Sequence, residues 1–187
     1  MISSEELQLI KNEEWIQRKR IVLDKIEKLF YQSAQKLQST NEYQQFCTGF
    51  PELKNLPKVN KGEMLRGLPW RMLDFPVHFS SDHVLANRLL FWWGQPLYNI
   101  LHLKGAYLQN LDFDKLSNVL LDNPNLKFRT EGEEWDFSFV EENIITKEII
   151  ESSAFLQIWK SYPLKTLEQM PVRFVEDFKI WKALLLD

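Results

Sequence analysis

The chain has 187 residues, of which 26 are acidic and 23 basic, so its formal net charge is −3. It contains only 6 glycines, about 3% of the residues where roughly 7% is usual. This scarcity argues against glycine-rich folds such as dinucleotide-binding domains. The chain has no apolar run of roughly 18 residues and no concentrated basic run, so we expect neither a membrane span nor a nucleic-acid-binding surface.

The length fits one domain covering residues 1–187. The single cysteine, Cys47, excludes an intrachain disulfide and suits a reducing compartment. The N-terminal sequence Met-Ile-Ser-Ser-Glu-Glu is acidic where a secretory signal is basic and then apolar. We therefore expect a cytoplasmic protein.

Residues 1–39 predict a long N-terminal helix. Ser3 and Glu6 have the spacing of a capping box, and apolar residues recur every seven positions at Leu9, Ile16, Leu23, Phe30 and Leu37. A helix of about 36 residues is about 54 Å long, which exceeds the roughly 40 Å diameter of a domain of this size. The helix must therefore bend or break, protrude, or be covered by a second copy. We favour a bundle helix that contributes to a homodimer.

The middle of the chain predicts an irregular segment and then a helix. Residues 40–80 contain four prolines and three glycines among many apolar residues, which indicates an ordered wrapping segment without a long helix. Residues 81–109 are strongly apolar, with a Gly94-Gln95-Pro96 step. We interpret them as a central kinked helix of the core. A short helix is expected over about 113–121.

The last third predicts one β-hairpin and then helices. Apolar and charged residues alternate on either side of Glu131-Gly132, which indicates a hairpin over 126–140. Residues 146–187 predict C-terminal helices, over about 146–161 and from Pro171 onward. The expected fold is mainly α: a helical bundle of five or six helices with an irregular proline-rich wrapping segment and one β-hairpin.

The candidate site lies within residues 62–107, which contain all three histidines. A polar group in an apolar element costs free energy unless it has a partner. Arginine, carboxylate and histidine in a partly dry pocket suit the binding of a small anion or the transfer of a proton. The candidate pocket consists of Arg71, Asp74, His78, Arg88, Trp92 and His102.

A purely structural role fits the same residues. Arg88 and Asp74 then form one ion pair that ties the wrapping segment to the central helix, and His102 is a core histidine with a backbone partner. No histidine pair has the spacing of a metal site, and no nucleophile or phosphate-loop motif occurs. The sequence therefore indicates no metal, no cofactor and no identifiable catalytic residue.

Two functions are compatible with these features. The first is a non-enzymatic binding or protein-interaction module that forms a homo-oligomer through the N-terminal helix. The alternative is a small-molecule enzyme or ligand receptor that uses the candidate pocket, with a small anionic ligand. Partners of nucleic-acid or membrane type are not expected.

Overall fold

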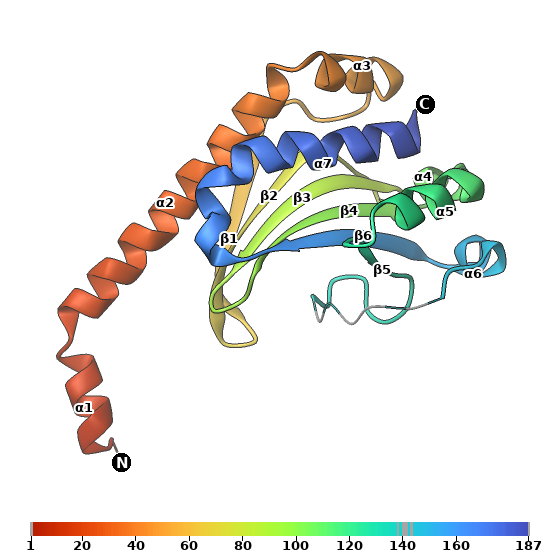
Figure 1. Ribbon diagram of the computed structural model, residues 1–187. Coiled ribbons are helices and arrows are strands. Elements are labelled where there is room, and N and C mark those ends of the chain that lie inside the picture. The colour runs from red at the N-terminus through yellow and green to blue at the C-terminus, as the bar shows by residue number, and fades with distance from the viewer. Residues whose placement is uncertain (1, 138, 140–141, 143, 187) are drawn as a thin grey trace.

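A computed structural model describes residues 2–137, 139, 142 and 144–186. The fold is mixed α/β: helices cover one face of a curved, six-stranded antiparallel sheet (Figure 1). The strand order is β1-β2-β3-β4-β6-β5. The strands are β1 (Lys58–Leu65), β2 (Leu68–Phe79), β3 (Val84–Trp92), β4 (Leu97–Lys104), β5 (Lys127–Arg129) and β6 (Phe155–Tyr162). The expected mainly α bundle is therefore wrong.

The N-terminal region forms two helices where one was expected. Helix α1 (Ser4–Ile10) begins with the expected capping box between Ser3 and Glu6, and α2 (Glu13–Gln38) follows after a break. Asn12 caps the start of α2, because its side chain accepts a hydrogen bond from the Trp15 N–H at 3.0 Å. A third helix, α3 (Asn41–Gly49), follows α2.

Residues 58–79 form β1 and β2, so the interpretation of 40–80 as an irregular segment is wrong over most of its length. The prolines are compatible with β2 because of where they lie. Pro69 is next to the start of the strand, and Pro76 lies where the register with β3 shifts between Asp74 and Val77. A proline at a bulge removes no regular ladder hydrogen bond.

The expected central helix over 81–109 is also wrong. Its two halves are β3 and β4, which pair in register from Val84↔Lys104 to Phe91↔Leu97, and Gly94 adopts a positive φ of 79° in the turn between them. Every residue of β3 is buried. A strand buried on both faces is a continuous apolar run, which has no period that distinguishes it from a buried helix.

The last third differs from the expectation in two places. Of the hairpin over 126–140, only β5 is a strand, and it pairs with β6; residues 138 and 140 lie outside the described part. Instead of one helix over 146–161, a short helix α6 (Lys147–Ser152) precedes β6. The expected helices near 113–121 and from Pro171 are confirmed as α5 (Phe113–Asp122) and α7 (Met170–Leu185). Two short elements complete the fold, α4 (Ala106–Gln109) and the 3-10 helix η1 (Leu164–Gln169).

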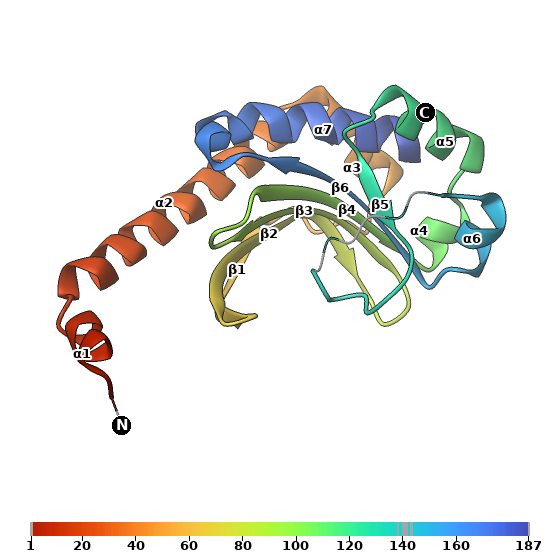
Figure 2. The same cartoon turned by 60° about the horizontal axis from the view of Figure 1, so that its bottom comes forward.

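The main core lies between the sheet and the pair α2 and α7, which cross the same face of it (Figure 2). Phe30 from α2 and Trp181 from α7 are fully buried in the same apolar cluster as Leu89 and Leu101 of the sheet. The segment that follows β5 passes over the opposite face of the sheet (Figure 2). Within the described residues, no helix is both long and apolar enough to cross a bilayer.

Candidate functional site

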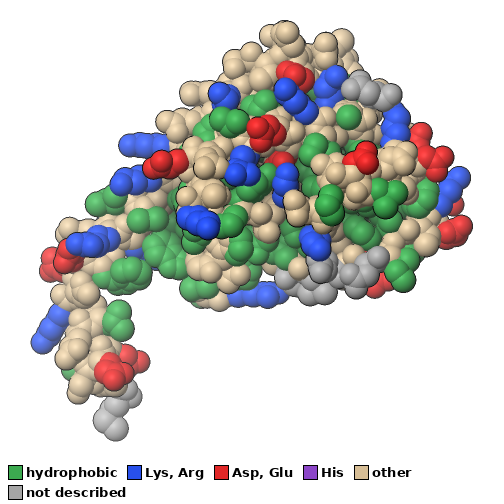
Figure 3. Space-filling view, viewed as in Figure 1, with side chains coloured by type: hydrophobic (Ala, Val, Ile, Leu, Met, Phe, Trp, Pro, Cys, Tyr) green, Lys and Arg blue, Asp and Glu red, His purple; other side chains and the backbone are tan. Residues whose placement is uncertain are grey.

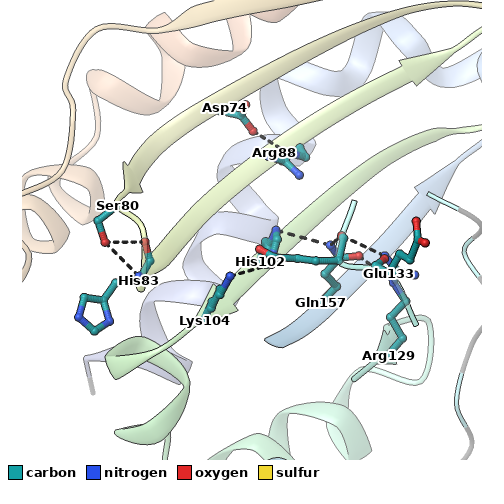
Figure 4. Close-up of polar contacts among 10 residues, drawn as sticks. Asp74, Ser80, His83, Arg88, His102, Lys104, Arg129, Glu133 and Gln157 are labelled. Carbon is teal, nitrogen blue, oxygen red and sulfur yellow. Dashed lines mark hydrogen bonds and ion pairs between the residues drawn. The ribbon is translucent and has the colours of Figure 1, made fainter. Parts of the chain in front are cut away.

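Five buried polar residues form a row across the sheet, on the face away from α2 and α7. Strand pairing places Asp74 beside Arg88, His102 beside Gln157, and Gln157 beside Arg129. Arg88 pairs with Ile100 and His102 with Ala86, so Arg88 and His102 are diagonal neighbours on β3 and β4. We call this row, which crosses β2, β3, β4, β6 and β5, the polar stripe (Figure 4).

Arg88 is the most constrained member of the polar stripe. Its side chain is 1% exposed, and its Nε donates a 2.6 Å hydrogen bond to Asp74 Oδ1. The guanidinium carbon lies 5.3 Å from the ring centre of Trp135 and 5.6 Å from that of Phe137. Its Nη1 has no hydrogen-bond partner. Asp74 and two aromatic rings therefore provide most of the stabilisation of this buried charge.

His102 is a neutral imidazole in this environment. Burial, together with the charges of Arg88, Arg129 and Lys104, lowers the pKa of His102 to about 3. Its Nδ1 lies 3.5 Å from Gln157 Nε2. Its Nε2 lies 3.2 Å from Glu134 Oε1, outside hydrogen-bonding geometry. The neutral ring offers Glu134 no positive charge near neutral pH. The ion-pair partner of Glu134 is Lys104, with 2.9 Å between Nζ and Oε2.

Residues 133–137 cover the polar stripe. Arg129 donates hydrogen bonds to the backbone carbonyls of Glu133 and Glu134, and Gln157 donates a third to the carbonyl of Glu134. The ring of Trp135 lies 5.1 Å from that of His102. Arg129, Gln157, Glu134 and Trp135 were not predicted as site residues, because their proximity to Arg88 depends on the position of β6 between β4 and β5.

The structure brings three of the six predicted residues together and separates the other three. Asp74, Arg88 and His102 share the polar stripe. Arg71 lies on the opposite face of the sheet, 3.9 Å from both Glu27 and Glu63. Trp92 is at the far end of β3, where its Nε1 donates to the carbonyl of Leu65 at 3.1 Å.

His78 lies at the end of β2 and contacts residues that were not predicted. Its Nδ1 is 2.7 Å from the hydroxyl of Tyr107, and that hydroxyl donates a hydrogen bond to Glu52. These three side chains line a hollow of about 470 Å³. Two further hollows, of about 740 and 340 Å³, lie beside α4 and beneath α2. None of these three hollows is lined by Asp74, Arg88 or His102.

A second feature of functional interest is the N-terminal arm, which we define as residues 2–22. Its α1 part extends away from the sheet, and Figure 3 shows apolar side chains of the arm at the lower left. Its α2 part touches the body of the protein, because the ring of Trp15 lies 5.9 Å from that of Trp93 and Lys19 pairs with Glu63 at 2.6 Å. None of its residues is buried, and the first buried residue of α2 is Leu23. The large apolar side chains exposed on it are Ile2, Leu7, Leu9, Ile10, Trp15, Ile16, Ile21 and Val22.

No family model, curated protein or solved structure matches the chain. Among the described residues, no group of three or more His, Cys, Asp or Glu side chains is arranged to hold a metal ion.

Proposed function

We propose that the protein is a non-enzymatic interaction module that pairs with a second copy of itself through the N-terminal arm. The observation that supports this most strongly is the exposure of eight large apolar side chains on one protruding segment. Ile10 is 67% exposed and Ile2 62%. Single exposed apolar residues are ordinary, but eight large ones within one segment of 21 residues indicate an interaction surface.

The length of α1 supports the need for a partner. Helices of this size are marginal in water, because the cost of forming the first turn is not recovered over so few residues. The described part of α1 buries no residue, so the body of the protein does not stabilise it. Covering the exposed apolar side chains of the arm would contribute on the order of 10 kcal/mol before the entropic cost of association.

The charge pattern of the arm favours a second copy as the partner. Its first half carries Glu5, Glu6 and Lys11, and its second half carries Glu13 and Glu14 followed by Arg18, Lys19 and Arg20. Within one chain, Arg18 pairs with Glu14 and Lys19 with Glu63. A two-fold axis near the α1–α2 break places the first half of one arm against the second half of the other. Glu5 and Glu6 of one copy then face the basic residues 18–20 of the other, and the same contact is repeated across the axis, as a self-complementary interface requires.

Sedimentation equilibrium tests this proposal. We expect the wild-type chain to have twice its monomer mass of 22.4 kDa at micromolar concentration. Leu9→Glu combined with Ile10→Glu should give the monomer mass, because two charges replace exposed apolar side chains near the middle of the arm. The matched control is Leu121→Glu, since Leu121 is 78% exposed on α5, away from the arm. A monomeric wild type, or a dimer that the double substitution leaves intact, would overturn the proposal.

A further inference from the structure

A hollow at one end of the sheet has the composition of a binding site and is separate from both the N-terminal arm and the polar stripe. It measures about 470 Å³, within the usual range for small-molecule pockets. Its walls come from the chain after α3, the end of β2, the residue before β3, α4 and the last turn of α7. We call it the end pocket.

Hydrogen bonds fix the polar side of the end pocket. Tyr107 has one hydroxyl proton and donates it to Glu52, so it accepts from Nδ1 of His78. This arrangement places the proton of a neutral His78 on Nδ1 and leaves Nε2 as an acceptor. Nδ1 of His83 accepts the Ala106 N–H at 3.0 Å, so a neutral His83 carries its proton on Nε2.

The charge of the end pocket is negative. The hydrogen bond from Tyr107 lowers the pKa of Glu52 below its ordinary value, so this carboxylate is ionised at neutral pH. Leu184 and Leu185 belong to the last turn of α7, where the helix dipole presents its negative end. None of the ten residues that line the pocket is lysine or arginine.

The remaining walls are apolar and aromatic. Leu111, Leu184 and Leu185 line one part, and the rings of Phe50 and Tyr107 meet edge to face at 5.8 Å. Aromatic rings attract cations through their electron-rich faces. A carboxylate beside aromatic rings and leucines is therefore complementary to a positively charged group attached to an apolar body.

We propose that the end pocket binds a small organic ammonium ion. The charged nitrogen pairs with the Glu52 carboxylate and donates to Nε2 of His78, while the apolar part of the ligand packs on Phe50 and the leucines. Tyr107 acts as a positioning residue, because it joins Glu52 to His78. An anionic ligand would meet both the carboxylate and the C-terminal end of α7, and the pocket offers it no counter-charge.

Isothermal titration calorimetry of the full chain tests this assignment with three probes of similar shape. Phenethylammonium is the cation, 2-phenylethanol the neutral analogue and phenylacetate the anion. We expect phenethylammonium to bind with one-to-one stoichiometry, at least about tenfold more tightly than 2-phenylethanol, and phenylacetate to show no binding. A tenfold ratio corresponds to about 1.4 kcal/mol.

Variants locate the site. Glu52→Gln removes the charge with little change of shape and should weaken the binding of phenethylammonium at least about tenfold. The matched control, Glu151→Gln, removes an exposed carboxylate that lines a different hollow and should leave the affinity unchanged. The assignment is overturned if phenylacetate binds as well as phenethylammonium, if Glu52→Gln has no effect, or if no heat of binding is measured at about 10 mM probe. The arm variant Leu9→Glu/Ile10→Glu should bind the cation like wild type, which separates this result from the proposed dimer.

Discussion

Arg88 and Asp74 form a buried ion pair directly across β2 and β3, with 2.6 Å between Nε and Oδ1. The pair links two adjacent strands at the position after which their register shifts. Because both side chains are almost completely buried, neither charge is compensated by water when the other is removed. The pair therefore constrains the register of the sheet at the centre of the polar stripe.

Asp74→Asn should lower the free energy of unfolding by about 3 kcal/mol or more, because it leaves the Arg88 charge buried without a counter-charge. Urea denaturation monitored by tryptophan fluorescence measures this change. Glu151→Gln is the control, since it breaks the exposed Lys147–Glu151 pair, which should change stability by less than about 1 kcal/mol. Equal losses of unfolding free energy from the two substitutions would show that the buried pair stabilises the protein no more than the exposed pair does.

The low pKa of His102 predicts how stability depends on pH. Unfolded His102 has a pKa near 6.5, whereas burial lowers the folded pKa to about 3. Between these values the unfolded state binds more protons, so the contribution of His102 is complete above pH 6.5 and is lost as the pH falls toward 3. The free energy of unfolding should fall by up to about 1.4 kcal/mol per pH unit from this residue alone.

His102→Gln isolates that contribution, because it removes the titrating ring and leaves the carboxylates unchanged. We expect urea denaturation between pH 4 and 6 to give a shallower slope for His102→Gln than for the wild type. Parallel pH profiles for the two proteins would mean that the folded pKa of His102 is not depressed.

Gly105 is predicted to tolerate no side chain. It adopts a φ of 62° before α4, and an added Cβ would overlap the backbone oxygen of Asp82 and Nδ1 of His83. Gly67 has a similar φ of 80°, but nothing lies within 4 Å of its added Cβ. Gly67→Ala should therefore cost about 1 kcal/mol from its backbone conformation alone, and Gly105→Ala should cost substantially more. Thermal unfolding of the two variants checks this order, and equal losses would contradict the overlap at Gly105.

The sequence predicted the local features of the fold better than its sheet. The Ser3–Glu6 capping box, α5 and α7 were predicted correctly, because caps and an apolar period are local signals. The strands β3 and β4 were missed because both faces are buried and the apolar runs have no clear alternation. Gly94 was interpreted as a kink although it lies in a hairpin turn.

The candidate site was only partly predictable for the same reason. Asp74 and Arg88 were proposed as partners, and the structure confirms the pair as a contact between strands. A regular hairpin closed by Ser80–His83 would place Phe75 opposite Arg88, and the register shift between Asp74 and Val77 brings Asp74 there instead. Tyr107 and Glu52 carry no comparable signal, since their contact with His78 forms only when α3, β2 and α4 come together.

Charge reversal tests the central claim, the pairing of two N-terminal arms, most directly. One variant carries Glu5→Lys and Glu6→Lys, and the other carries Arg18→Glu and Arg20→Glu. We expect each variant alone to sediment at the monomer mass of 22.4 kDa, because like charges face each other across the two-fold axis, and an equimolar mixture to sediment at twice that mass. A mixture that stays monomeric, or single variants that associate as strongly as the wild type, would contradict the account.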